Sequence, residues 1–370
     1  MSAISVIIPC HNRALDLKRV LEAYDNQDTT APFELIAIDD ASSDGTDAVL
    51  RSFHPRRFIL RVERLERNQG PAAARNHGIA LATAPLLLFT GDDICPEPNL
   101  IEGHLQAHRH HPESRVAILG RVEWAKDMLQ NTLMTHIDGI GAQQFSYHYF
   151  RDGAEYDFRH LYTCNVSLKR DFLCSLDHWF DTDFLYPAFE DAELGYRLAR
   201  RGLRIIYNAS LLAYHYHYHT IWSFSVRQYN CGRMAWLITR KHPLGVGRVL
   251  YKQYVRVLEP LWLPHRMLRS FSSTVADWLE AQVLHLASFY EWTPHKLLDN
   301  LYLRTLDYFY YKGLIDGIFE RTPIVTRLRL VHAAHSLVPL LRWFVSAAHS
   351  AHIPFPYGNS TELLKTLASF

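Results

Sequence analysis

Three pairs of adjacent carboxylates mark the positions where this sequence could do chemistry. Asp39–Asp40 closes the apolar run FELIAIDD, Asp92–Asp93 closes LLFTGDD, and Glu190–Asp191 opens the helical run EDAELGYRLARRG. Adjacent carboxylates repel each other unless a cation compensates their charge. A hard divalent cation such as Mg²⁺ or Mn²⁺ takes carboxylate oxygens as ligands and removes that repulsion. The two pairs at strand ends therefore predict a polar site that holds a divalent cation.

Each pair also has a plainer interpretation, which stays open on the residues alone. Asp39 and Asp40 are placed to cap a helix that begins near Ser43, as acids do in many strand-to-helix turns. Asp92 can cap the segment that follows it, with Asp93 in solvent. The third pair can be the ordinary acidic first turn of a helix, which stabilises a helix by a few tenths of a kcal/mol up to about 1 kcal/mol.

A run of alternating histidines is a second candidate for metal binding. In YHYHYHT (214–220), His215, His217 and His219 fall on one face of an extended segment, because strand side chains alternate with a period of two. Imidazoles gathered on one face can bind a metal ion. A polar strand face stacked with tyrosines is the alternative.

The elements that must position these residues alternate between strand and helix. Apolar runs predict strands, and apolar residues at helical spacing predict the helices between them. The predicted strands are 4–10, 33–40, 57–65, 85–90 and 115–124, and the predicted helices are 13–27, 42–53 (N-cap Ser42 or Ser43) and 70–84. This order predicts an α/β fold with a mostly parallel sheet covered on both faces. Ligands bind outside the carboxyl ends of such strands, where the first two acid pairs fall.

The later part of the chain has a different character. A short helix is predicted at 190–202, with Gly202 as its C-cap, and a strand follows at 203–210. From about residue 225 the sequence becomes helical and aromatic. We therefore expect a first domain of residues 1–225 and a helical C-terminal extension of residues 226–370.

Bulk composition narrows the classes of partner and compartment. The chain has 370 residues and a formal net charge of +1, which gives no reason to expect a nucleic-acid partner. Its five cysteines are scattered without a CxxC pair, so a reducing setting is favoured over a disulfide framework. The sequence shows neither the pattern of a signal peptide nor the roughly 18 uncharged apolar residues of a transmembrane helix. We expect a cytoplasmic protein, with any membrane contact at the inner face.

Five motifs, in their order and spacing, resemble those of a known family. They are SVIIPCHNR, IAIDDASSDGT, NQGPAAARNHGI, LLFTGDDI and FEDAELGYRL. Together they resemble the inverting family 2 glycosyltransferases with the GT-A fold, over roughly residues 4–220. The resemblance implies a Rossmann-like sheet and the transfer of a sugar from a nucleoside diphosphate to a hydroxyl group.

The resemblance also assigns a nucleotide-sugar site. Asp39 matches the aspartate that accepts the N–H of uracil, and Pro9 ends the first strand beside the nucleotide. Arg75 matches the arginine of the NxGxxxARN motif, which meets the diphosphate or supports the metal-binding acids. Asn165 matches a loop on the acceptor side. The residues expected to bind the nucleotide sugar are Pro9, His11, Arg13, Asp39, Asp40, Arg75, Asp92 and Asn165.

The metal site departs from the pattern of the family. Relatives usually carry Asp-x-Asp, whereas Gly91 makes the motif Gly-Asp-Asp here. We expect Asp93 to be the direct ligand of Mn²⁺ or Mg²⁺, and Asp92 to be the second acid, nearer the ribose or sugar of the donor. Some relatives add a histidine about two dozen residues after the catalytic acid. His215 is the better candidate for it here, and His217 the second.

The resemblance implies a catalytic base in the third acid pair. A sugar hydroxyl that attacks the anomeric carbon must lose a proton to a base. In the family the second acid of the ED motif takes it, so Asp191 is the expected base. Glu190 would orient hydroxyl groups of the acceptor or donor.

The C-terminal third is basic and aromatic. Residues 221–275 hold nine Lys or Arg residues and one acid, Glu259. Such a region could lie on an anionic membrane and reach a lipid-linked acceptor, or it could pack on the rest of the protein with a solvated basic face. The segments 301–319 and 332–349 are amphipathic and are expected to pack together or to form a homo-oligomer contact.

These observations predict an inverting, metal-dependent glycosyltransferase with UDP as the expected nucleotide. Its acceptor would be a saccharide or a lipid-linked acceptor in bacterial polysaccharide or glycolipid synthesis. The QxxRW motif of processive synthases is absent, which favours a single transfer. A sugar nucleotidyltransferase is the enzyme alternative, but HNRALDL lacks the glycine-rich loop that it needs. A non-catalytic nucleotide-sugar-binding protein is the other alternative, and only Gly91 suggests it.

Overall fold

The computed structural model describes residues 2–140, 144–243, 245, 273–293, 296–319, 341 and 343. The chain divides into two compact units, each discontinuous in sequence. The first consists of Met1–Leu129 and Ser146–His217, and the second of Gln130–Phe145 and Tyr218–Phe370. The boundary expected at residue 225 from the sequence stays a prediction.

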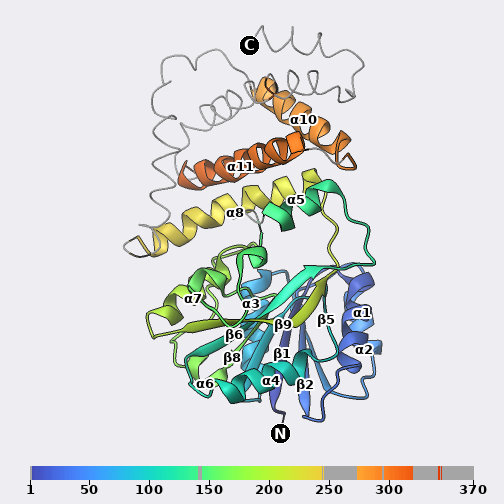
Figure 1. Cartoon of the computed structure of the whole chain (residues 1–370), viewed down its shortest axis with the longest axis vertical. Helices are drawn as coiled ribbons and strands as arrows, with labels where there is room; N and C mark the ends of the chain where they lie inside the picture. Colours follow the sequence, from blue (N-terminus) through green and yellow to red (C-terminus); the bar gives the residue numbers. More distant parts are fainter. Residues whose placement is uncertain are drawn as a thin grey trace. The chain divides into compact units, whose positions relative to one another are not determined.

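The first unit is built on one sheet, in which the described residues form nine strands (Figure 1). The strands are β1 (Ile4–Cys10), β2 (Phe33–Asp39), β3 (Ile59–Arg64), β4 (Leu86–Thr90), β5 (Ile94–Pro96), β6 (Val116–Trp124), β7 (Glu155–Tyr156), β8 (Asn165–Lys169) and β9 (Arg204–His215). Their order is β3-β2-β1-β4-β8-β6-β9-β5, and β7 pairs with β9. The first four strands are parallel, which confirms the predicted α/β fold with a mostly parallel sheet.

Strand β8 was not predicted, and it divides the sheet. It pairs antiparallel with β4 on one side and with β6 on the other. Val166 and Leu168 are buried apolar residues that alternate with Ser167, which is also buried. A short run with a polar centre gives a weak strand signal, so its position depends on the strands that flank it.

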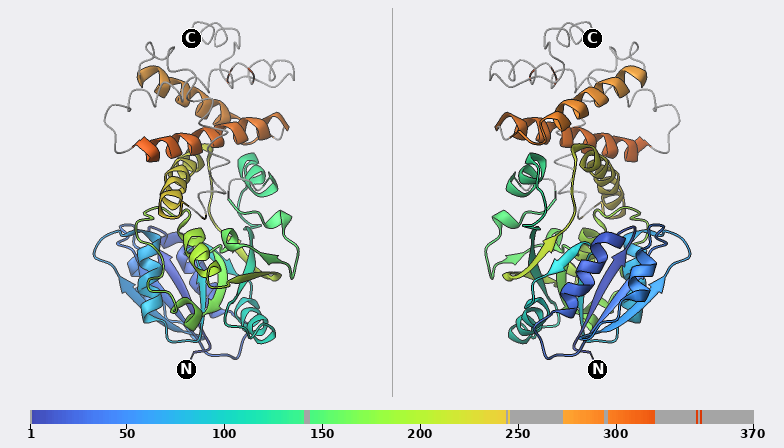
Figure 2. Two further views of the ribbon diagram at one scale, coloured as in Figure 1. Left: turned by 90° about the vertical axis from the view of Figure 1, so that its left-hand side faces the viewer. Right: turned by 90° about the vertical axis from the view of Figure 1, so that its right-hand side faces the viewer.

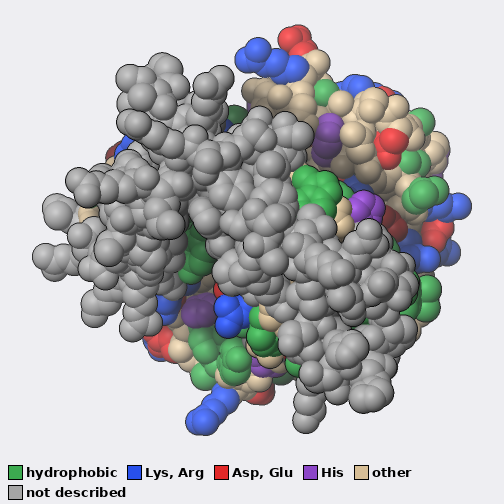
Figure 3. All heavy atoms as spheres, turned by 90° about the horizontal axis from the view of Figure 1, so that it is seen from above, with side chains coloured by type: hydrophobic (Ala, Val, Ile, Leu, Met, Phe, Trp, Pro, Cys, Tyr) green, Lys and Arg blue, Asp and Glu red, His purple; other side chains and the backbone are tan. Residues whose placement is uncertain are grey.

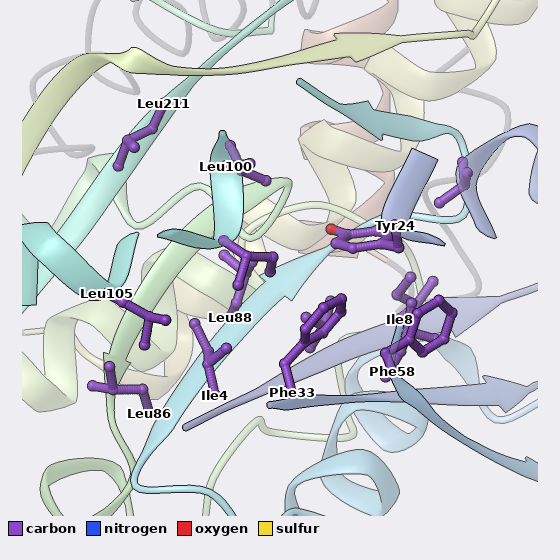
Figure 4. Close-up of a cluster of buried hydrophobic side chains, with 14 of the residues drawn as sticks. Ile4, Ile8, Tyr24, Phe33, Phe58, Leu86, Leu88, Leu100, Leu105 and Leu211 are labelled. Atoms are coloured by element: carbon purple, nitrogen blue, oxygen red, sulfur yellow. The ribbon is translucent and has the colours of Figure 1, made fainter. Parts of the chain in front are cut away.

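Helices cover both faces of this sheet. They are α1 (Ala14–Asp25), α2 (Thr46–Ser52), α3 (Gly70–Leu81), α4 (Leu100–His110), α6 (Arg170–Leu173) and α7 (Glu190–Ala199), with short 3₁₀ turns at Tyr147–Tyr149 and Phe158–His160. On one face, Ile4, Tyr24, Leu88 and Leu105 belong to a single apolar cluster between the sheet and helices α1 and α4 (Figure 4). On the other face α3 lies so close that a Cβ on Gly78 would come within 2.5 Å of the Ile7 side chain.

The predicted N-cap of the second helix is wrong. Helix α2 begins at Thr46 after Gly45, whose φ of 97° few other residues adopt. Asp44 accepts hydrogen bonds from the Thr46 backbone N–H and hydroxyl, so a turn stands before the helix. Ser42 instead accepts from the backbone N–H of Asn12. A chain segment from the neighbouring strand end competes for that hydroxyl, which local sequence does not reveal.

The second unit is helical in its described part. It contains α5 (Thr132–Ile140), α8 (Ile221–Lys241), α10 (Ser273–Phe289) and α11 (Lys296–Phe319), shown from two sides in Figure 2. Helices α8 and α11 touch backbone to backbone, because a Cβ on Gly232 would lie 1.9 Å from the Tyr310 carbonyl oxygen and one on Gly313 would lie 1.8 Å from that of Tyr229. The predicted helix at 301–319 falls within α11.

The expectations about membrane-spanning helices and about the C-terminal segments can be compared only with the described part of the chain. Within that part, no helix combines the length and apolar character needed to span a membrane. Residues 246–272 of the basic segment, and most of 332–349, lie outside the described residues. Figure 3 shows one face of the molecule with side chains coloured by type. Around the rim of that face, Lys and Arg side chains are scattered among Asp and Glu.

Candidate active site

The ends of four parallel strands bring four sequence-predicted segments into contact. After β1, the backbone N–H of His11 donates to Asp92 Oδ2 at 2.9 Å, in the segment after β4. The ring Nδ1–H of His11 donates to the carbonyl oxygen of Asp40, after β2, at 2.8 Å. Its Nε2 accepts from the side-chain amide of Asn68, after β3, at 3.0 Å. The predicted polar edge of the sheet is therefore a connected hydrogen-bond network.

Asp93 meets two of the three alternating histidines. Its Oδ2 lies 3.0 Å from His217 Nδ1 and 3.4 Å from His215 Nε2. Antiparallel pairing of β5 with β9 puts His215 opposite Ile94 and so carries the histidines to the acid pair. The third histidine, His219, belongs to the second unit and lies against the Phe224 ring.

These three side chains form a group that could hold a metal ion. One ligand atom from each of Asp93, His215 and His217 lies within 4.8 Å of the other two. The His215 ring stacks on Trp124, with ring centroids 5.0 Å apart and planes 14° apart, so its orientation is fixed. One carboxylate and two imidazoles are a donor set that first-row divalent ions accept, with positions left for other ligands. The residues fit a divalent cation.

The two adjacent acids have different electrostatic environments. Burial and the neighbouring charge of Asp93 raise the pKa of Asp92 above its ordinary value. Burial would also raise the pKa of Asp93, but His215, His217 and Arg13 together hold it well below its ordinary value. Asp93 is therefore the acid that carries a negative charge, which is the form that binds a cation.

Arg13, expected to bind the nucleotide sugar, reaches the group formed by Asp93, His215 and His217. Its guanidinium lies 3.2 Å from Asp93 Oδ2 and 3.9 Å from Asp92 Oδ1, and it contacts His217 Nδ1. Its backbone N–H donates to the Thr46 hydroxyl at 2.9 Å. The loop after β1 thus contributes a cation to the centre of the site.

The first acid of the third pair, Glu190, is buried against Arg75. Helix α7 begins at Glu190, and Arg75 of α3 donates to Glu190 Oε1 at 2.9 Å. Both side chains are nearly buried, and within the described chain Arg75 Nε and Glu190 Oε2 have no protein partner. Arg75 thus supports the acid beside the expected base, whereas the sequence had suggested the diphosphate or the acids of the metal site.

Asp191 has the environment of a carboxylate that can act as a base near neutral pH. Burial and the charge of Glu190 raise its pKa to about 7, although Arg75 acts in the opposite direction. Its Oδ1 accepts from the Ala192 backbone N–H at 2.7 Å, which fixes the carboxylate. A base is most effective when its pKa is close to the working pH.

The two carboxylates of the first acid pair, Asp39 and Asp40, accept hydrogen bonds from other groups of the protein. Asp39 is fully buried and accepts from the Arg64 guanidinium at 2.6 Å and from the Ser42 N–H at 3.0 Å. Asp40 accepts from the backbone N–H groups of Gln69 and Gly70, at 2.7 and 2.8 Å. It therefore caps α3, not the helix near Ser43. The nucleotide-binding roles expected for both acids stay predictions.

Two other expected binding residues lie within the sheet. Asn165 in β8 donates to the carbonyl oxygens of Arg121 and Leu211 and contacts His104 Nε2 at 3.0 Å. All these partners are protein groups, and the structure does not bring Asn165 to the Asp93 group. Pro9 is half-buried at the end of β1, opposite Ile38 of β2. Their binding roles stay predictions.

Backbone strain is concentrated beside the candidate residues. Among the described residues, the non-glycine positions with positive φ are Asn12 (54°), Ala41 (55°) and Phe189 (67°). Each is adjacent to a candidate site residue: His11 and Arg13, Asp40, and Glu190. A left-handed conformation costs a non-glycine residue about 1–2 kcal/mol and persists only where surrounding contacts enforce it. Surrounding contacts therefore enforce this conformation in three of the segments that build the site.

Trp124 and Asn68 are the site residues that sequence reasoning missed or undervalued. Trp124 is the last residue of β6, and the parallel register pairs it with His215. An aromatic residue at the end of a strand beside a predicted ligand strand is the signal that could have indicated it. Asn68 was not among the residues expected to bind the nucleotide sugar, yet its side-chain amide fixes the His11 ring.

Comparison with known proteins shows which family and which relatives this chain resembles. Residues 5–173 match the family described as Glycosyl transferase family 2. Validoxylamine A glucosyltransferase of Streptomyces hygroscopicus subsp. limoneus is 29% identical over 279 residues, which cover 65% of this chain and 57% of that protein. Chondroitin synthase of Escherichia coli is 25% identical over 241 residues, which cover 58% and 35%. The chain thus spans well under two thirds of these relatives' length.

Solved structures share the fold at low sequence identity. The mannosyltransferase PcManGT from Pyrobaculum calidifontis, in complex with GDP-Man and Mn²⁺, matches with a TM-score of 0.55 at 16% identity and covers 86% of this chain and 88% of that one. S. aureus TarS 1-349 matches with a TM-score of 0.51 at 15% identity and covers 87% and 92%. Residues 5–173 thus match family 2 of the glycosyl transferases, and the solved structures share the GT-A fold of this chain.

Proposed function

We propose that this protein transfers a sugar from a nucleoside diphosphate sugar to an acceptor hydroxyl, with inversion at the anomeric carbon and with the help of a divalent cation. The observation that carries the proposal is the convergence of Asp93, His215 and His217 at the edge of the sheet where β1–β4 end. Related folds give support, since PcManGT was solved with GDP-Man and Mn²⁺, and TarS with UDP.

In this proposal Asp93, His215 and His217 hold the cation, and Asp92 lies beside them toward the donor. When bound, a divalent cation compensates the charge that builds up on the diphosphate as it leaves. The low pKa of Asp93 keeps that ligand ionised. Trp124 holds the His215 ring in one orientation, and a fixed ligand loses less entropy on binding.

Asp191 serves as the base that takes the proton of the acceptor hydroxyl. Its raised pKa, about 7, suits it to accept a proton at neutral pH. Glu190 keeps its charge paired with Arg75 through Oε1, and Oε2 is placed to accept from a sugar hydroxyl. One base and one direct displacement give inversion, because the hydroxyl attacks from the side opposite the leaving diphosphate.

The nucleotide and the acceptor belong to the same proposal. UDP is the first candidate for the nucleotide, from the resemblance of Asp39 to a uracil-reading aspartate. GDP is the comparison to make, because PcManGT was solved with GDP-Man. For the acceptor we propose a saccharide or lipid-linked hydroxyl of bacterial polysaccharide synthesis, the process in which relatives such as chondroitin synthase act by name.

A binding experiment separates these claims before any acceptor is known. We expect UDP to raise the thermal unfolding temperature in the presence of Mn²⁺ and much less without it, because a ligand stabilises the state that binds it. Asp93→Asn should lose the effect of Mn²⁺. An equal response to GDP would contradict the choice of uracil, and no response to any nucleotide would contradict the donor claim.

A second experiment tests the base. With a panel of UDP-sugars and acceptor extracts, we expect Asp191→Asn to release UDP at least about 10²-fold more slowly than the wild type. The variant should still bind UDP with Mn²⁺, since Asn preserves the shape of the side chain. Turnover equal to the wild type would remove Asp191 as the base and leave the binding results intact.

A further inference from the structure

Arg13 contacts two of the three proposed metal ligands through the atoms that would bind the metal. Its guanidinium lies 3.2 Å from Asp93 Oδ2 and touches His217 Nδ1. The same Oδ2 lies 3.0 Å from His217 Nδ1 and 3.4 Å from His215 Nε2. The guanidinium of Arg13 thus contacts the same side chains that would bind a divalent cation.

The His217 nitrogen that contacts Arg13 cannot serve both cations at once. An imidazole nitrogen has one lone pair, which either accepts an N–H of Arg13 or binds a metal ion. A guanidinium carries five N–H donors and no acceptor, so it cannot itself become a ligand. The two positive charges would also repel each other at this short distance. Occupation by one cation therefore excludes the present position of the other.

The contacts around Arg13 leave its side chain able to move while its backbone is held. The backbone N–H of Arg13 donates to Thr46, and that of Ala14 donates to Asp44 Oδ2 at 3.0 Å. The side chain is 26% exposed, so part of it already faces solvent. Two further acids lie within reach: Asp16 Oδ2 at 3.8 Å and Asp92 Oδ1 at 3.9 Å.

We propose that Arg13 competes with the divalent cation for Asp93 and His217, and that cation binding moves the guanidinium to Asp92 and Asp16. Arg13 is a positioning residue in this scheme: it compensates Asp93 and holds the ligands together before the cation enters. The inference rests on the metal site of the proposed function. Its consequence is that the native protein binds its cation more weakly than the three ligands alone would allow.

Titration with Mn²⁺ alone tests the competition without any turnover. Calorimetry and the loss of the free Mn²⁺ signal in electron paramagnetic resonance give the dissociation constant for each variant. We expect Arg13→Gln to bind Mn²⁺ about tenfold more tightly, because it removes a charge-assisted contact that the metal must break. Arg13→Lys keeps the charge and lacks the planar fork, so its affinity should fall between the two.

Arg19→Gln is the matched control for net charge. Arg19 lies on α1, the helix that follows Arg13, and its guanidinium is 4.0 Å above the ring of Tyr216, the residue between the two histidine ligands in sequence. Its removal takes away a nearby positive charge outside the ligand group, so we expect less than about a twofold change, since solvent screens exposed charges.

Two results would overturn the inference. Unchanged or weaker Mn²⁺ binding by Arg13→Gln would mean that Arg13 does not compete, and equal tightening by Arg19→Gln would reduce the effect to net charge. If the wild type, Arg13→Gln and Asp93→Asn all bound Mn²⁺ with equal affinity, the proposed metal site itself would be wrong. Circular dichroism and thermal unfolding confirm that each variant is folded.

Discussion

Gly91 determines how close Asp93 can stay to its histidine partners. A Cβ at position 91 would lie 3.1 Å from Asp93 Oδ1 and 3.2 Å from the Ile94 side chain. Either contact is tighter than ordinary packing allows, so a side chain there would press on the carboxylate that faces His215 and His217. The glycine in place of the usual acid therefore leaves room for the Asp93 carboxylate beside the two imidazoles. With a side chain at 91, Asp93 or Ile94 would have to shift by a few tenths of an ångström.

The raised pKa of Asp191 also has a consequence for stability. A carboxyl whose folded pKa lies above its unfolded value contributes stability below the unfolded pKa and loses it as pH rises through the folded pKa. For Asp191 that window runs from about 4 to about 7. We expect Asp191→Asn to unfold at a higher temperature than the wild type at pH 8, with the difference shrinking toward pH 4.

Calorimetry at several pH values measures this difference. Asp47→Asn is the control, since Asp47 forms an ion pair with Arg51 at the surface and its loss should change stability little. A wild type that is more stable than Asp191→Asn at pH 8 would contradict the raised pKa. It would also remove the pKa argument for Asp191 as the base, which the turnover experiment tests separately.

At the scale of elements, local pattern predicted most of the first half. Strands β1–β4 and their helices follow from runs of apolar residues, and the acids at their ends follow from the rule that parallel strands share a carboxyl edge. The insertion of β8 and the reach of Arg13 to His217 could not be predicted, and Trp124 had only its place at a strand end to indicate the stack on His215. Each depends on pairing between residues far apart in sequence, which local patterns do not encode.

Asp40 shows how an element is tied to the site. Both of its carboxylate oxygens accept backbone N–H groups at the start of α3, the helix that carries Arg75. We expect Asp40→Ala to reduce the free energy of unfolding by about 2 kcal/mol, because the Gln69 N–H loses its acceptor and the buried Gly70 N–H keeps only Asn68 Oδ1 at 3.2 Å. Denaturant unfolding measures the loss.

Asp47→Ala is the comparison for this prediction as well. It removes an acid from the first turn of α2 without uncovering a buried donor, so about 0.5 kcal/mol or less is expected. If the two variants lost equal stability, the capping role of Asp40 would be wrong. Activity lost at full stability would instead favour the nucleotide-binding role that the sequence suggested.

At the scale of the molecule, the two units depend on different kinds of contact. The first is held by a sheet core, and the second by helices whose glycines allow close approach. The basic segment that could meet a membrane begins on α8, where Arg227, Arg233, Arg240 and Lys241 face no acid within the helix itself. Membrane contact and packing of this segment stay alternative predictions.

Gly313→Ala tests whether the second unit unfolds separately. Its Cβ would lie 1.8 Å from the Tyr229 carbonyl oxygen, so α8 and α11 must move apart, at a cost of about 1–3 kcal/mol. Gly317→Ala is the control on the same helix: its Cβ meets only the Trp236 side chain and Arg233, at 3.2 Å or more, and alanine favours helix by about 1 kcal/mol.

Hydrogen exchange of Gly313→Ala should show lost protection in α8 and α11 with strands β1–β4 unchanged, because stability is distributed in separate cooperative units. Equal loss of protection in the sheet would mean that the chain unfolds as one unit, and the glycine contact would then stabilise the catalytic fold as well.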